Sequence, residues 1–381
     1  MKSLNIVGLG AASGYGLGVS KLMGGLKSGA SSVARHRCPG GSFPDNSWFA
    51  RVPVERDEEG HLSRYSACVG SVIDEAVEDA RIRGWKPGRK VAIIHGSAWN
   101  DLESMKVLLD HPTEHMRRAY IGYLPTTPLA IAAAKHGING PVFTINGACA
   151  TGLCALMLAQ RLMACGDATD VIACGTEVGA PAPILDGLHQ LGVLQTDRPA
   201  ADMGQPLSAD SKGFLYGEAA SAVVLTNEHF DSRYMQLVSS VFAHDGYHPI
   251  SIEPTHVQID EAMSDALERA KLSADQIRTF VPHGTGTRQC NDADLHMLRQ
   301  LPGVSRVVAP KPFVGHSRAA ASLLETIVMA SSIGDGRSVE HAPAPVYLDH
   351  LDLAEPADQS FPCLHMSLGA GGSIGVAIYQ R

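Results

Sequence analysis

Residues 141–175 constrain the fold of this chain more than any other stretch, because they join elements of two different periodicities. Pro-Val-Phe-Thr-Ile-Asn is an apolar run typical of a buried strand, Gly-Ala-Cys is typical of a turn, and 150–165 has helical spacing up to Gly166. A second apolar, strand-like run follows at 170–174. Strand, helix and strand in this order predict a βαβ unit, with Cys149 where the first strand passes into the helix.

The same alternation continues along the rest of the chain. Further strands are predicted at 4–9, 90–95, 235–242, 277–281 and near Val307, and helices at 64–83, about 260–271 and 319–333. The second set of elements echoes the first in order, although no clear sequence repeat is visible. Because 381 residues exceed the usual size of one core, we predict an α/β protein of two related halves, 1–231 and 232–381.

The composition indicates a compact protein with 45% hydrophobic residues, 18% charged residues and 39 glycines. A net charge of −8 gives no general attraction for nucleic acid or anionic lipid. No window of about 18 apolar residues marks a membrane span, and glycines interrupt the N-terminal apolar run before a signal-like core forms. The eight cysteines form no CxxC pair, so we expect free thiols, no bound metal and a cytoplasmic location.

Cys149 is the candidate nucleophile because of its place in the predicted unit. The small residues around it leave room for a substrate to approach the backbone, and the next helix begins at once. The N–H groups and partial positive charge of a helix N-terminus are expected to lower the thiol pKa and to stabilise an oxyanion. The structural alternative is a small buried cysteine that fills space beside glycine and alanine.

Two histidines add to the evidence for chemistry. His283 in VPHGTGT and His316 in KPFVGH each stand beside glycine at the end of an apolar, strand-like run. A single histidine in such a place is more often structural. Two in the same setting, each followed by small residues, favour a shared catalytic role.

Together these segments resemble the elongating beta-ketoacyl carrier-protein synthases, which are members of the thiolase-fold superfamily. The resemblance covers nearly the whole chain through LNIVGLGAASGYGLG, TINGACATGL, SKGFLYGEAASAVVL, VPHGTGT, KPFVGHSRAAASLLE and SLGAGGSIG, in the family's order and spacing. One cysteine with two histidines matches the Cys-His-His branch rather than thiolases or chain-starting synthases. The resemblance implies a thiolase-like fold with layered α-β-α-β-α architecture.

By this resemblance, Cys149 accepts the acyl group, and His283 and His316 donate hydrogen bonds to the carbonyl oxygen of a malonyl thioester that loses carbon dioxide. Lys311 and Glu325 match buried supporting residues, and a solvated strand-end charge is the alternative for Lys311. Other matches are the backbone N–H groups of Cys149 and Ala370 as an oxyanion hole, and Thr285 and Thr287 as residues that hydrogen-bond the phosphopantetheine arm. Gly369 and Gly371 are further expected substrate-binding residues, and Arg117, Arg118 and Arg64 are expected carrier-docking residues. Turn-stabilising hydroxyls and a solvated helix face are the alternatives for the threonines and for the Arg117-Arg118 pair.

The chain departs from the family's pattern in three segments. Residues 205–208 and 211–212 replace an Arg-Pro-aromatic-Asp segment and the Arg-Asp that follows it, so an internal charge network is missing. Leu368 and Ala370 replace two phenylalanines, one of which gates the nucleophile, and this implies space for a bulkier acyl group or an unusual acceptor. Residues 58–61 lack a basic run that often helps carrier docking.

Three functions remain open at this point. The first is a decarboxylative Claisen condensation in a specialised fatty acid or polyketide pathway, with acyl carrier protein as partner and no cofactor beyond the carrier's phosphopantetheine. The second is acyl transfer from Cys149 to a hydroxyl or amine, with His283 as general base. The third is a non-catalytic chain-length subunit, against which the intact Cys149, His283 and His316 argue. The resemblance also implies a homodimer or a heterodimer with a related synthase subunit, and no nucleic acid or membrane partner.

Overall fold

The computed structural model describes residues 2–37, 46–55, 63–110, 116–196, 205–208, 211, 213–333 and 360–381. Within them, one 11-stranded sheet runs through the molecule. Its strands, in spatial order, are β11 (Arg306–Val307), β10 (Thr279–Val281), β12 (Cys363–Gly369), β13 (Ser373–Gln380), β9 (Met235–His244), β1 (Leu4–Ser13), β8 (Ala219–Thr226), β7 (Asp170–Glu177), β5 (Val91–Gly96) and β6 (Val142–Ile145), with β2 (Gly16–Leu17) beside β1. A separate hairpin joins β3 (Ala34–Arg37) and β4 (Asn46–Phe49).

The two halves of this sheet have the same strand order and direction. In the first half β6, β5 and β7 are parallel, and β8 and β1 continue antiparallel. In the second half β11, β10 and β12 are parallel, and β13 and β9 continue antiparallel. The halves meet where Leu4–Ile6 of β1 pair with Met235–Leu237 of β9. Two related halves, expected from the order of elements, are therefore present in the topology although no sequence repeat announces them.

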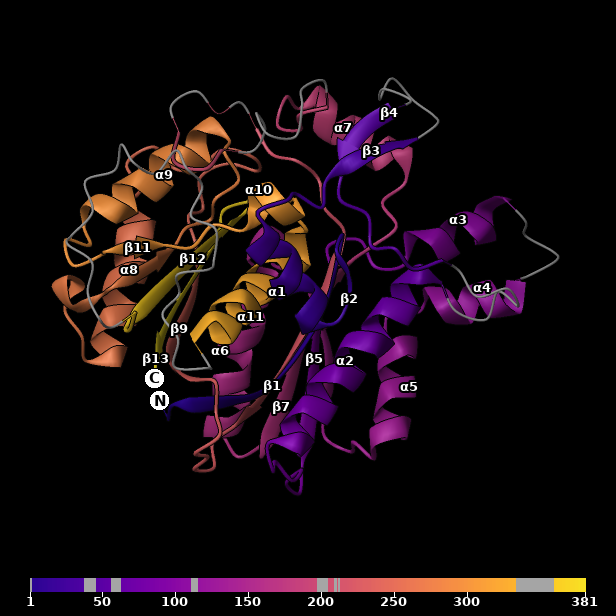
Figure 1. Ribbon diagram of the computed structural model, residues 1–381, viewed down its shortest axis with the longest axis horizontal. Coiled ribbons are helices and arrows are strands. Elements are labelled where there is room, and N and C mark those ends of the chain that lie inside the picture. The colour runs from indigo at the N-terminus through magenta and orange to yellow at the C-terminus, as the bar shows by residue number, and fades with distance from the viewer. Residues whose placement is uncertain are drawn as a thin grey trace.

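Helices form three layers around the two half-sheets (Figure 1). The middle layer holds α6 (Thr151–Ala164) and α11 (Ala321–Ile333), which pack against strands of both halves. One outer layer is α2 (Arg64–Ile82) and α5 (Thr127–His136), and the other is α8 (Val257–Ala270) and α9 (Arg288–Arg299). The predicted α-β-α-β-α layering is confirmed.

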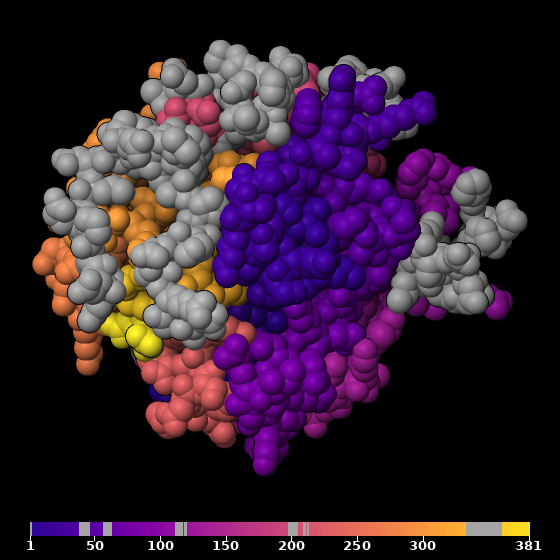
Figure 2. All heavy atoms as spheres, viewed as in Figure 1, coloured from indigo at the N-terminus to yellow at the C-terminus, as the bar shows by residue number. Residues whose placement is uncertain are grey.

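The remaining elements lie around these layers. They are the helices α1 (Val19–Ser28), α3 (Leu102–Asp110), α4 (Met116–Tyr123), α7 (Ala182–Gln190) and α10 (Lys311–Val314), and the 3-10 turns Ala148–Ala150, Ala274–Gln276 and Arg318–Ala320. On one face the N-terminal segment with α1 lies between the two halves (Figure 2). Among the residues described, no helix combines the length and apolar character needed to cross a membrane.

The predicted elements agree with the observed ones to within a few residues, with one exception before His316. The apolar run in KPFVGH is not a strand but the short helix α10. Pro312 suits the first turn of a helix, and Gly315 ends it with a φ of 72°, which favours glycine. His316 therefore follows a helix, whereas His283 follows β10 as predicted.

Candidate active site

Cys149 lies between the first half-sheet and the middle helix layer, in the turn Ala148–Ala150 that connects β6 to α6. Thr151 closes this turn, because its hydroxyl accepts from the Gly147 N–H at 2.8 Å and donates to the Ala148 carbonyl at 2.6 Å. The thiol-bearing residue is 9% exposed. The strand-to-helix position predicted for Cys149 is the observed one.

The predicted lowering of the Cys149 pKa is wrong in direction. Burial raises the pKa of the thiol, and the charges of Arg318 and Lys311 offset only part of that effect. The backbone N–H of Ala370 donates to the sulfur and also opposes the rise in pKa. The resting thiol is therefore protonated near neutral pH, and the Ala370 N–H stands beside it, where the predicted oxyanion hole requires a donor.

β12 connects the nucleophile to the first histidine. The Ser367 hydroxyl donates to the carbonyl oxygen of Cys149 at 3.0 Å. The next residue, Leu368, donates its N–H to Nδ1 of His283 at 3.2 Å. Since Nδ1 accepts this bond, the proton of a neutral His283 ring lies on Nε2.

The two histidines predicted from distant motifs lie side by side. The ring centroids of His283 and His316 are 5.5 Å apart and the rings are nearly perpendicular. Phe214 packs edge-on against His316 at 5.1 Å. Neither ring nitrogen of buried His316 has a hydrogen-bond partner among the residues described. Buried polar atoms are almost always paired, so these nitrogens indicate a ligand position.

Both rings are neutral near pH 7. Burial, aided by the charges of Lys311 and His365, lowers the pKa of His283 well below its ordinary value. Burial and the charges of Lys311, His283 and Arg318 do the same to the pKa of His316. A neutral imidazole still offers one N–H, so the pair can donate hydrogen bonds to an oxygen that gains negative charge.

Lys311 and Glu325 form a buried pair behind the histidines. The Lys311 ammonium donates to the carbonyl oxygen of His283 at 2.5 Å and pairs with Glu325. The side chains of Lys311 and Glu325 are only 4% and 2% exposed, so the solvated-charge alternative for Lys311 is wrong. The other carboxylate oxygen of Glu325 contacts Nε2 of His365 at 3.1 Å.

Two supporting residues were not found from the sequence. His365 lies inside the apolar strand β12, and nothing in its neighbours signals a partner. Asp294 accepts from the N–H groups of His283 and Gly284 at 2.7 and 2.8 Å. A carboxylate among Ala293 and Met297, on the buried face of α9, is a signal that could have identified Asp294.

The predicted substrate-binding residues also surround the site. The hydroxyls of Thr285 and Thr287 lie 3.4 Å apart, and both hydrogen-bond Cys290, whose thiol pKa burial raises to about 11. Gly369 approaches the nucleophile loop so closely that a Cβ would lie 2.6 Å from the Gly147 carbonyl oxygen. Gly371 has a φ of 90° in the turn between β12 and β13. The role of Thr285 and Thr287 in binding the pantetheine arm, and that of Gly369 and Gly371 in binding substrate, stay predictions.

The departures from the family pattern have local explanations. Leu207 donates its N–H to Asn291 at 3.0 Å, and Asn291 donates to the carbonyl oxygen of Ser208 at 2.8 Å. The side-chain amide of Asn291 therefore holds residues 207–208, in the place where the family's pattern has a network of charged side chains. Leu368 is buried and Ala370 is exposed, and neither position places an aromatic ring beside the thiol. Lys212 and residues 58–61 lie outside the described residues.

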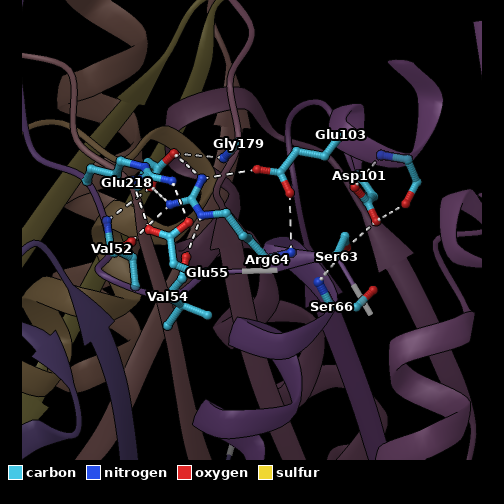
Figure 3. Close-up of polar contacts among 12 residues, drawn as sticks. Val52, Val54, Glu55, Ser63, Arg64, Ser66, Asp101, Glu103, Gly179 and Glu218 are labelled. Atoms are coloured by element: carbon cyan, nitrogen blue, oxygen red, sulfur yellow. Dashed lines mark hydrogen bonds and ion pairs between the residues drawn. The ribbon is translucent and has the colours of Figure 1, made fainter. Parts of the chain in front are cut away.

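Arg64 is not a docking residue. The predicted role requires an exposed charge, but Arg64 is 6% exposed and pairs with Glu218 at 2.5 Å and Glu103 at 3.0 Å (Figure 3). It also donates to the carbonyl oxygens of Val52 and Val54. Its position at the start of α2, over the buried end of β8, explains the correction. Arg117 is exposed on α4, and the side chain of Arg118 lies outside the described residues.

Replacing Arg64 with methionine should destabilise the protein by about 3–5 kcal/mol, because the Glu218 carboxylate would stay buried without its cation. Urea unfolding monitored by circular dichroism measures the change. The matched control is Arg51→Met, which breaks an exposed pair with Glu55 and should cost about 0–1 kcal/mol. Equal losses in the two variants would contradict the assignment.

Glu177, at the end of β7, is a buried carboxyl in the same region. It accepts hydrogen bonds from the backbone N–H groups of Ala98, Trp99 and Ala319. Burial raises the pKa of Glu177 to about 7, although Arg318 and these donors favour the charged form. No local pattern indicated this residue in advance, because a carboxylate that ends an apolar strand is also a common surface feature.

Replacing Glu177 with glutamine should change how stability depends on pH. The folded protein holds this proton more tightly than the unfolded chain, so the stabilisation is present below the unfolded pKa and is lost as pH rises through about 7. Between about pH 5 and about pH 8, the parent should lose roughly 2–3 kcal/mol of unfolding free energy relative to Glu177→Gln. Urea unfolding at both pH values tests this, with exposed Glu261→Gln as the control. A pH-independent difference would contradict it.

Comparison with known proteins agrees with this geometry. Models of the beta-ketoacyl synthase N-terminal and C-terminal domains match residues 45–230 and 234–343. The chain is 28% identical over 376 residues to 3-oxoacyl-acyl-carrier-protein synthase 2 of Rhizobium meliloti, covering 91% of this chain and 87% of that one.

Two solved structures share the fold. A beta-ketoacyl synthase from Burkholderia phymatum has a TM-score of 0.81 at 22% identity over 100% of both chains. A ketosynthase structure, described as a type II polyketide synthase carrier protein in complex with its ketosynthase, has a TM-score of 0.80 at 19% identity over 100% of this chain and 99% of that one. Because the two domain models together match most of its length, the chain belongs to the beta-ketoacyl synthase family.

Proposed function

We propose that this protein condenses an acyl group held on Cys149 with a malonyl group held on an acyl carrier protein. The observation that carries the proposal is the pair of neutral rings, His283 and His316, which lie side by side. Both nitrogens of His316 lack a hydrogen-bond partner among the residues described. The homologous synthase is named for acyl carrier protein, and a structural relative is described in complex with one. These names support the choice of partner, and exposed Arg117 is the proposed docking charge.

In the first half-reaction, the sulfur of Cys149 attacks the acyl thioester. The thiol proton passes to the departing carrier thiol, and the acyl–sulfur bond moves from carrier to enzyme. The N–H groups of Cys149 and Ala370 stabilise the negative oxygen of the tetrahedral intermediate. Because the thiol is neutral in the free enzyme, it loses its proton during this step and not before the substrate binds.

In the second half-reaction, the malonyl carbon–carboxylate bond breaks and carbon dioxide leaves. The electron pair forms an enolate, whose oxygen accepts hydrogen bonds from His283 and His316. The enolate carbon attacks the acyl carbonyl and expels Cys149 as a thiolate, which regains a proton from water. The product is a 3-oxoacyl thioester two carbons longer, and no step needs a cofactor of the enzyme's own.

Acyl transfer to a hydroxyl or amine is less well supported. That reaction assigns His283 the role of general base, which needs a free nitrogen lone pair. The Nδ1 lone pair of His283 is occupied by the Leu368 N–H, and Nε2 carries the proton. A fixed donor suits enolate stabilisation and does not suit proton abstraction.

Mass spectrometry tests the proposed function. Incubation with acyl carrier protein should add the acyl mass to the peptide that contains Cys149. Malonyl carrier protein should then discharge it as a 3-oxoacyl product with one carbon dioxide released. Loading without extension, or discharge without carbon dioxide, would reject condensation.

We also propose that two copies, or this chain and a related subunit, pair through the edge strand β6. Val142 on β6 is 41% exposed. Replacing it with lysine should yield a monomer, because charge on an open strand edge opposes edge-to-edge pairing. Sedimentation equilibrium measures the mass, and Val257→Lys on α8, where valine is 42% exposed, is the matched control. A dimeric Val142→Lys protein would place the interface elsewhere.

All seven described cysteines are free thiols. We propose a cytoplasmic location, since proteins of oxidising compartments commonly use disulfides.

A further inference from the structure

The turn after His316 brings a charged side chain to the nucleophile. Arg318 opens the 3-10 turn Arg318–Ala320, which packs against the turn Ala148–Ala150 that holds Cys149. The two turns are equivalent in the two halves, since each leads from the outer parallel strand of its half into a middle-layer helix. In the second half the short helix α10 lies between that strand and the turn. Each begins with left-handed backbone, at φ 50° for Ala148 and φ 46° for Arg318. The first half has alanine at the equivalent position, Ala148, so the backbone of the turn does not require arginine.

The guanidinium of Arg318 stacks on an aromatic ring, but it forms no hydrogen bond or ion pair with any residue that the structure describes. Its central carbon lies 4.0 Å from the ring centroid of Trp99, over the ring face. Its Nε is buried and has no hydrogen-bond partner among the residues described. In that part of the chain no carboxylate lies within ion-pair distance of Arg318, and Glu177 acts on it only through longer-range charge. None of the described residues therefore occupies the fork of N–H donors that suits a carboxylate.

Glu177 fixes the two segments that make this site. Its carboxyl accepts backbone N–H groups from Ala98 and Trp99, after β5, and from Ala319, beside Arg318. Ala320 also receives the Ser221 hydroxyl on its carbonyl oxygen at 3.0 Å. Trp99 and Arg318 are thus held together by buried contacts from both halves of the molecule. A site fixed in this way is formed before any ligand binds.

The site formed by Arg318 and Trp99 lies on the first-half side of the nucleophile turn, whereas His283 and β12 belong to the second half. The parallel strands β6, β5 and β7 end at Ile145, Gly96 and Glu177, and the chain after β6 leads directly into the nucleophile turn. The Asn146 amide donates to the Ala98 carbonyl oxygen at 3.2 Å, which ties the Cys149 loop to the Trp99 loop. An acyl chain on Cys149 that ran toward the Trp99 loop, away from the histidines, would meet Arg318.

We propose that Arg318 binds a carboxylate on the acyl group carried by Cys149, so that the preferred primer is the half-thioester of a dicarboxylic acid. This inference rests on the proposed function and names its substrate class. The malonyl carboxylate is the other anion available. Pairing it with Arg318 would stabilise the charge that must be lost as carbon dioxide, and ground-state binding of that kind slows the step.

The test compares glutaryl and valeryl thioesters, which have equal chain length and differ in the terminal carboxylate. Loading of Cys149 from acyl pantetheine is followed by intact-protein mass spectrometry, so that carrier docking does not enter. The parent should load glutaryl roughly 10- to 100-fold faster than valeryl. In Arg318→Met this ratio should fall toward one, and in Arg318→Lys it should stay above the methionine variant.

Each of the other possible loading results would lead to a different conclusion. Loading of both acyl groups at equal rates by the parent would overturn this inference and leave condensation intact. Loading of neither would instead reject the proposed function. A glutaryl preference that persists in Arg318→Met would overturn the role of Arg318. Carbon dioxide release from malonyl pantetheine that falls in Arg318→Met, with an unchanged glutaryl ratio, would assign the arginine to the malonyl group. If Arg318→Met does not fold, the parent ratio and Arg318→Lys still decide.

Discussion

Replacing Cys149 with alanine should abolish acyl loading and condensation but leave carbon dioxide release from malonyl carrier protein. In the proposed reaction the thiol is the only group of the protein that forms a bond to the acyl carbon. The enolate, in contrast, needs the histidine N–H groups, whose hydrogen bonds do not involve the sulfur. Intact-protein mass spectrometry measures loading, and a coupled carbon dioxide assay measures decarboxylation.

The control for this result is Cys154→Ala. Cys154 is a half-buried free thiol on α6, about one turn beyond the nucleophile. It should carry no acyl group in the parent or in Cys149→Ala. An acyl adduct on Cys149→Ala would place the nucleophile elsewhere. Loss of carbon dioxide release in a folded Cys149→Ala protein would mean that the thiol takes part in decarboxylation.

Replacing His316 with alanine should lower carbon dioxide release by about 10²–10³-fold, the usual effect of removing one donor from a preorganised oxyanion site. Neither nitrogen of His316 has a hydrogen-bond partner in the described part of the chain, so the ring has no structural hydrogen bond there to lose. Loading of Cys149 should change much less, because the proposed donors for that step are backbone N–H groups. Single-turnover assays of each half-reaction separate the two effects.

His229→Ala is the control for the histidine prediction, since its side chain is 82% exposed and remote in sequence from every site residue. It should leave both half-reactions unchanged. If His316→Ala slowed loading and decarboxylation equally, the ring would be positioning the whole site, and its role as an enolate donor would be wrong.

Much of the fold could be predicted from local pattern. The run from 141 to 175 placed Cys149 between a strand and a helix, because apolar periodicity changes sharply there. Resemblance of motifs then pointed to His283 and His316, which the structure brings to within 5.5 Å between ring centroids. Pattern alone would not have paired them, since each lies in a separate loop.

What the sequence could not provide depends on burial and on contacts between distant segments. Arg64 was expected at the surface as a docking residue by resemblance to the family, yet it is buried together with Glu218, which lies far along the chain. The expected low pKa of Cys149 came from the helix terminus alone, whereas desolvation proved the larger effect. His365 and Asp294 act through contacts that no local spacing encodes.

The proposed reaction depends on the rings of His283 and His316 together holding the oxygen of the malonyl thioester. A crystal structure of the protein with a malonyl pantetheine amide, which cannot transfer its acyl group, tests this directly. We expect the amide oxygen within about 2.7–3.2 Å of one nitrogen on each ring. An ordered ligand whose oxygen contacts neither imidazole would contradict it.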